Sequence, residues 1–122
     1  MNKKLAFLAL ALACGLASAQ SAQHKVTLSW TASPDSTAAN PGTANVWRAT
    51  GACPTTGAPT GATEISTSAP AGGPYVDSNV AAGSTYCYYV TATISGATSG
   101  PSNTTQPTVG PFPPGGLTVV VD

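Results

Sequence analysis

Apolar residues recur at every second position in several short segments of this chain, and that alternation constrains the fold more than any other feature of the sequence. It is clearest in KVTLSW at residues 25–30, ANVWRAT at 44–50 and YCYYVTAT at 86–93. Successive side chains of a β-strand point to opposite faces, so a two-residue spacing is typical of a strand with one buried face. Shorter strand candidates lie at 64–67 and 75–77, and turn-forming Gly, Pro, Asn and Ser separate the segments.

A helical fold is disfavoured by the same pattern. No segment after residue 19 carries apolar residues at helical spacing without an intervening Gly or Pro. Many short strands separated by turns are typical of an all-β antiparallel sandwich or barrel.

The alternation also assigns side chains to the two faces of each strand. In the segment at 44–49, one face holds Ala44, Val46 and Arg48, and the other holds Asn45, Trp47 and Ala49. In the segment at 86–93, one face holds Tyr86, Tyr88, Val90 and Ala92, and the other holds Cys87, Tyr89, Thr91 and Thr93. We expect one face of each strand to be buried.

Residues 1–19 have the features of a secretory signal peptide. Lys3 and Lys4 precede an apolar run at 5–12, and Ala-Ser-Ala at 17–19 supplies small residues for cleavage. The run is shorter than the roughly 20 residues of a membrane-spanning helix, so we expect no membrane span. The sequence thus predicts a secreted, periplasmic or cell-surface bacterial protein that begins near Gln20. As a minor alternative, Ala-Leu-Ala-Cys at 11–14 resembles a lipobox, which would make Cys14 an acylated first residue.

Charge and composition disfavour several classes of function. After residue 19 the only cations among the side chains are Lys25 and Arg48, so a nucleic-acid partner is not expected. His24 is the only histidine, and no paired carboxylates or nucleophile motifs occur, so we expect no metal, no cofactor and no catalysis. Asp77 is interpreted as a turn-capping acid between two strands.

The ordered segments resemble the fibronectin type III family over about residues 24–109. KVTLSW is similar to the second strand of that family, ANVWRATG at 44–51 to the third, residues 74–93 to the fifth and sixth, and SGPSN at 99–103 to the opening of the seventh. The resemblance implies an immunoglobulin-like sandwich of about seven strands over residues 20–109. It also implies that Trp30 and Tyr88 belong to the core, and that Tyr86 is a tyrosine-corner residue bonded to backbone near 80–83.

The resemblance further implies a disulfide bond between Cys53 and Cys87. In such a sandwich the third and sixth strands are antiparallel neighbours, and the two cysteines lie at their adjoining ends. Removal of Cys14 with the signal peptide leaves an even number of cysteines in an oxidising compartment. Metal binding and a redox dithiol are the alternatives, but the sequence lacks further ligands and a Cys-x-x-Cys spacing.

Two features suggest binding. Trp47 and Tyr89 would be neighbours on an outer face if Ala49 opposes Cys87, and Arg48 was expected to extend along the same surface. Such a surface fits a protein partner or, alternatively, a polysaccharide, although the aromatic pair could equally serve only to stabilise the sheet. We expect a non-catalytic interaction or structural module.

The second feature is the segment at 110–122, a Pro and Gly spacer followed by the strand-like Leu-Thr-Val-Val-Val at 117–121. It resembles the first strand of a fibronectin type III domain, which is missing before Lys25. We expect it first to fold back and fill that vacancy, second to be a loose tail, and third to insert into another copy as a strand-exchanging filament subunit. The protein would accordingly be a monomer or a strand-exchanged oligomer.

Overall fold

The computed structural model describes residues 22–115 and 117–121, and the expected signal peptide and Cys14 lie outside this range. The described residues form six strands and contain no helix that could cross a membrane. The strands are β1 (Val26–Leu28), β2 (Thr43–Thr50), β3 (Thr63–Pro70), β4 (Tyr75–Asp77), β5 (Tyr86–Ile94) and β6 (Ala97–Thr98).

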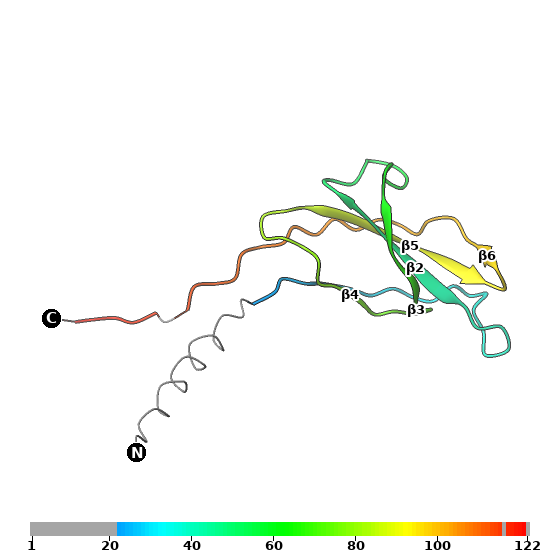
Figure 1. Ribbon diagram of the computed structural model, residues 1–122, viewed down its shortest axis with the longest axis horizontal. Helices are drawn as coiled ribbons and strands as arrows, with labels where there is room; N and C mark the ends of the chain where they lie inside the picture. The colour runs from blue at the N-terminus through cyan, green and yellow to red at the C-terminus, as the bar shows by residue number, and fades with distance from the viewer. Residues whose placement is uncertain (1–21, 116, 122) are drawn as a thin grey trace, which may run out of the picture.

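The strands form two antiparallel sheets, as the sequence predicted for an all-β chain. β1 pairs with β4 in one sheet, and the other has the order β3-β2-β5-β6. Figure 1 shows the small sheet lying across one side of the large one. The arrangement is that of a sandwich, but the described residues contain six regular strands where about seven were expected.

The chain after β6 continues along β5 as an irregular edge. The amide of Ser102 donates to the Val90 carbonyl at 2.8 Å, and Thr105 and Tyr88 exchange two backbone hydrogen bonds at 3.0 and 3.1 Å. Pro101 and Pro107 have no N–H to donate, which restricts proline to edges and interruptions of a sheet. The segment at 99–109 is thus paired with β5 without forming a continuous strand.

The core lies between the two sheets and is built from the faces that the alternation predicted to be buried. Val46 and Tyr88 are almost fully buried in the large sheet, and Leu28 reaches them from β1. Trp30 packs at the margin of this cluster, and its indole N–H donates to the Ala71 carbonyl at 2.8 Å. The remaining buried core members are Ala44, Ala69, Tyr86 and Val109.

The pairing of β2 with β5 sets the geometry of the large sheet. It runs without interruption from Thr43 opposite Thr93 to Thr50 opposite Tyr86. Ala49 lies opposite Cys87, which is the register on which the outer-face aromatic pair depends. Just before β5, the Ala81 N–H donates to the Tyr86 hydroxyl at 3.0 Å, within the segment that the resemblance indicated.

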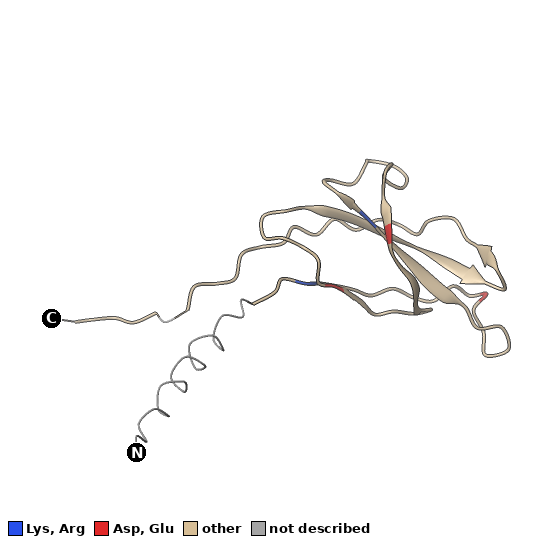
Figure 2. Ribbon diagram, in the orientation of Figure 1, with Lys and Arg blue, Asp and Glu red and all other residues tan. Residues whose placement is uncertain are grey.

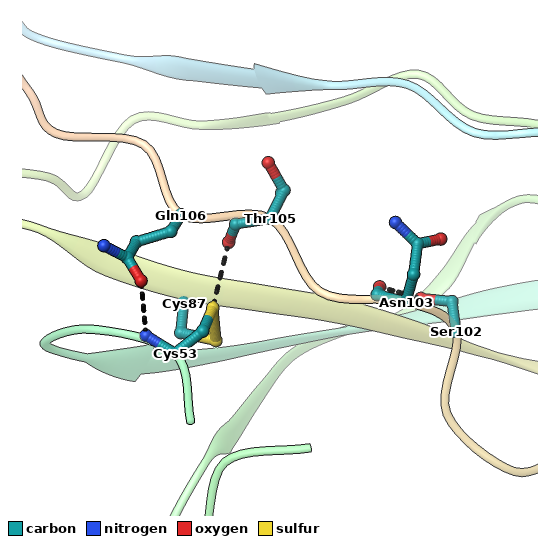
Figure 3. The surroundings of a disulfide bond; sticks show 6 residues. All are labelled: Cys53, Cys87, Ser102, Asn103, Thr105 and Gln106. Atoms are coloured by element: carbon teal, nitrogen blue, oxygen red, sulfur yellow. Dashed lines mark hydrogen bonds between the residues drawn. A yellow bond between two sulfur atoms is a disulfide. The ribbon is translucent and has the colours of Figure 1, made fainter. Parts of the chain in front are cut away.

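The predicted disulfide between Cys53 and Cys87 is confirmed, with a Cα–Cα distance of 5.0 Å (Figure 3). Cys53 lies in the loop after β2, and its N–H donates to the Gln106 side-chain oxygen at 2.7 Å. Its sulfur lies 3.5 Å from the Thr105 carbonyl oxygen; a cystine sulfur has no hydrogen, so this is a packing contact. The bridge thus fastens the β2–β3 loop to β5 next to the segment at 99–109.

The expectation that the tail folds back into its own domain is wrong. Residues 110–115 and 117–121 leave the sandwich as an extended segment (Figure 1), and Leu117 is 96% exposed. The place of a first strand stays open, because β1 pairs only with β4 among the described residues. The tail leaves the sandwich beside the start of β1, where Phe112 stacks on His24, and the Pro-Pro stretch that follows favours an extended course away from the domain.

Removing the bridge by Cys53→Ala with Cys87→Ala should lower the free energy of unfolding by about 3 to 4 kcal/mol. The disulfide closes a loop with a sequence separation of 34, and its loss enlarges the unfolded ensemble. Urea unfolding of the oxidised wild type and the double variant measures the difference. The reduced wild type is the control, because it loses the bond but keeps both sulfur atoms, and a loss below about 1 kcal/mol in both would contradict a stabilising role.

Candidate functional site

The most strongly interacting ionisable groups come together inside the sandwich, between β2, β4 and β5. The Arg48 guanidinium donates to the Asp77 carboxylate at 2.7 Å, and the Tyr88 hydroxyl donates to the same carboxylate oxygen at 2.7 Å. The Asp77 side chain is 4% exposed and that of Arg48 18% exposed. We call Arg48, Asp77 and Tyr88 the inter-sheet cluster, because it joins β2 and β5 of the large sheet to β4 of the small one.

Further contacts hold each member of the inter-sheet cluster. Arg48 also donates to the Asn79 carbonyl at 2.9 Å, and its guanidinium lies over the Tyr86 ring, 5.4 Å from the centroid. The second carboxylate oxygen of Asp77 accepts from the Asn79 N–H at 3.0 Å, which is the turn cap that the sequence predicted.

The protonation of the cluster follows from burial and hydrogen bonding. Burial by itself would raise the pKa of the Asp77 carboxyl, but the hydrogen bonds from Tyr88, Arg48 and the Asn79 amide outweigh it and hold that pKa below its usual value. Burial, together with the hydrogen bond to the Asp77 carboxylate, raises the pKa of the Tyr88 hydroxyl. At neutral pH the cluster is therefore a charged Arg48–Asp77 pair, with the neutral Tyr88 hydroxyl as a second donor to the carboxylate. In this state it joins the two sheets by non-covalent bonds.

The structure corrects the expectation for Arg48. Its side chain does not extend along the surface of Trp47 and Tyr89; it points to the opposite face of β2 and binds Asp77. The alternation had correctly placed Arg48 on the same face as Val46. The sequence did not show that Asp77 on the other sheet would pair with the guanidinium and so allow its burial.

Trp47 and Tyr89 do lie opposite one another on the outer face of the large sheet. Their rings stack with centroids 5.7 Å apart and an angle of 2° between the planes. The Trp47 indole N–H donates to the Thr91 hydroxyl at 3.2 Å. Because the rings are parallel, offset and stacked, they do not form one flat surface of two coplanar rings on which a sugar chain could lie.

Polar side chains beside the aromatic pair are bonded to one another. The Asn45 amide donates to the Glu64 carboxylate at 2.8 Å and accepts from the Thr93 hydroxyl at 2.8 Å. Glu64 lies opposite Trp47 across the β2–β3 pair. We call Asn45, Trp47, Glu64 and Tyr89 the outer-face patch; it combines two half-buried aromatic rings with a satisfied polar network.

A second candidate surface is the open flank between β1 and the segment at 99–112. Three adjoining hollows follow this flank, with volumes of about 450, 100 and 160 Å³. We call this the flank groove, and its lining includes Val26, Leu28, Trp30, Val90, Val109 and Phe112. Val26, Trp30 and Val90 are only partly buried, so the core is incompletely covered here.

The sequence did not predict the inter-sheet cluster or the flank groove. The available signal for the groove was the lack of a strand-like segment just before Lys25, a place that the tail was expected to fill. His24 lies at one end of the groove, with its ring stacked on Phe112 at a centroid distance of 3.9 Å. Figure 2 shows the few charged residues spread thinly over the sandwich, and the described residues contain no group of three metal-ligating side chains.

Asp77→Asn should lower the free energy of unfolding at pH 7 by on the order of 3 kcal/mol, because it leaves the Arg48 guanidinium without its carboxylate. Since the folded-state pKa of Asp77 lies below its unfolded value, the wild type has the full stabilisation above about pH 4 and loses it as the pH falls through the folded-state pKa. The difference between wild type and variant should therefore shrink on acidification, which urea unfolding between pH 2 and pH 7 measures.

The matched control is Asp35→Asn, which removes an exposed carboxylate outside the cluster. It should change stability by no more than about 0.5 kcal/mol. A difference between Asp77→Asn and wild type that stays constant over the acid range would contradict the assignment of the ion pair.

No protein-family model and no curated protein matches this sequence. The functional interpretation therefore depends on the geometry of the cluster, the patch and the groove. Of these, the cluster is internal, while the patch and the groove present side chains to the surroundings of the molecule.

Proposed function

We propose that this chain is an exported, non-catalytic interaction module of fibronectin type III type. Pairing of β1 with β4 and of β2 with β5 supports the proposal. The resemblance assigns β1 and β4 to the second and fifth strands of that family, and β2 and β5 to the third and sixth. β6 and the irregular edge at 99–109 then take the place of the seventh. On this assignment the part of the chain that the structure describes holds no counterpart of the first strand.

The observation that carries the proposal is that the ion pair and the cystine both serve to hold the sandwich together. The ion pair of Arg48 and Asp77 joins the two sheets, and the cystine fastens the loop after β2 to β5. Both immobilise the frame, and neither is directed into a cleft where a substrate could reach it. A rigid sandwich of this kind acts through its faces and edges.

Export is supported by the cystine, since disulfides persist in oxidising compartments. Together with the expected signal peptide, the cystine supports a location in the periplasm, on the cell surface or in the medium. The outer-face patch is then the face available to a protein partner. A protein contact fits better than a sugar, because the rings stack on each other and the Asn45 amide is already bonded to Glu64 and Thr93.

Labelled mature protein, residues 20–122, should bind saturably to the surface fraction of its own cells. Tyr89→Ala should weaken this binding about tenfold, as expected for an aromatic residue at the centre of a contact. Val76→Ala is the matched control, since Val76 is 46% exposed on β4 in the other sheet. Retention on insoluble polysaccharides should be low and equal for all three proteins.

Two outcomes would contradict the assignment. Polysaccharide retention that Tyr89→Ala abolishes would identify a carbohydrate-binding module. Absence of saturable binding by folded protein, with near-ultraviolet circular dichroism as the check on folding, would exclude the outer-face patch as a binding surface.

A further inference from the structure

The flank groove has the position and chemistry of a vacant strand site. On the side away from β4, the backbone of β1 has no hydrogen-bonded partner among the described residues. The groove follows that free edge, and its walls include the partly buried Val26 and Trp30. An extended segment lying there would satisfy the free N–H and C=O groups of β1 and cover the open side of the core.

The tail is an apolar strand that has no such partner. Leu117, Val119, Val120 and Val121 are between 82% and 96% exposed. As a strand it would place Leu117, Val119 and Val121 on one face and Thr118 and Val120 on the other. The apolar face of the tail thus matches the apolar wall of the groove.

Direction decides whether the tail can reach the groove of its own domain. Phe112 stacks on His24 at the end of the groove where β1 begins, and Figure 1 shows the tail leaving the sandwich from this end. A tail that turned back there would run parallel to β1. To run antiparallel it would have to enter beside Trp30 at the far end.

The shortness of the spacer disfavours that second route, because the spacer would have to run nearly fully extended past β1 and then reverse. The residues between Phe112 and Leu117 are Pro-Pro-Gly-Gly, so this stretch spans at most about 17 Å. The strand from His24 to Trp30 is about 20 Å long, and the chain would also have to reverse. The tail of another molecule approaches from outside and is free of this restriction.

We propose that residues 117–121 of one copy insert antiparallel to β1 in the flank groove of a second copy. Each copy has one tail and one groove, and the contact is therefore head-to-tail and generates filaments or rings. The inference rests on the proposed function, and it names one partner of the module as a second copy of the chain.

The test uses the full mature chain, residues 20–122, in size-exclusion chromatography with light scattering over a range of concentrations. The wild-type mass should rise with concentration, and Val119→Asp should weaken association at least about tenfold by placing a charge against the apolar wall. Thr118→Asp is the matched control: it adds the same charge to the same segment on the face that points away from the groove, and it should associate like wild type. Both positions lie in the exposed tail, so neither change alters the fold.

Hydrogen exchange locates the contact. Amides of Val26–Leu28 and of residues 117–121 should exchange more slowly as wild type assembles, and Val119→Asp at the same concentration should show no such slowing. A wild type that stays monomeric at millimolar concentration, equal effects of the two aspartates, or slowing at β3 or 99–109 instead of β1 would each overturn the inference. These results are separate from the proposed function, because Val119→Asp leaves the outer-face patch intact and its binding to the surface fraction can be measured on the monomer.

Discussion

The register between β2 and β5 is the constraint on which the rest of the structure depends. Because side chains alternate between faces, the pairing of Ala49 with Cys87 brings Cys87 next to the loop that carries Cys53 and stacks Trp47 on Tyr89. The same register turns Arg48 inward. A slip by one residue would move every side chain of β5 to the other face and separate all three features at once.

The side chains that this register turns inward explain how so small a sandwich holds its two sheets together. The small sheet consists of β1 and β4, each of three residues, and it buries little apolar area by itself. The Arg48–Asp77 pair and the Tyr88 hydroxyl tie it to the large sheet from inside. The charges persist in a buried position because each is paired, and together with the cystine they supplement a limited core.

The two candidate surfaces differ in what the sandwich leaves unsatisfied there. In the outer-face patch the Asn45 amide and the Trp47 indole N–H are bonded within the sheet, so the aromatic rings are the main contact area that it offers a partner. The flank groove has both a free backbone edge and incompletely covered core residues. A free backbone edge can pair with any extended segment. The apolar side chains that line the groove favour segments with an apolar face.

The sequence by itself determined the all-β class, most strand positions, which faces of β2 and β5 are buried, and the cystine pairing, the last through a family resemblance. These depend on period-two alternation and on the pairing of neighbouring strands, which are local or nearly local properties. Only the tertiary structure decided that Arg48 meets Asp77, 29 residues away, and that the tail points out of its own domain. Both depend on how the two sheets and the chain ends are placed in space, which no spacing along the chain encodes.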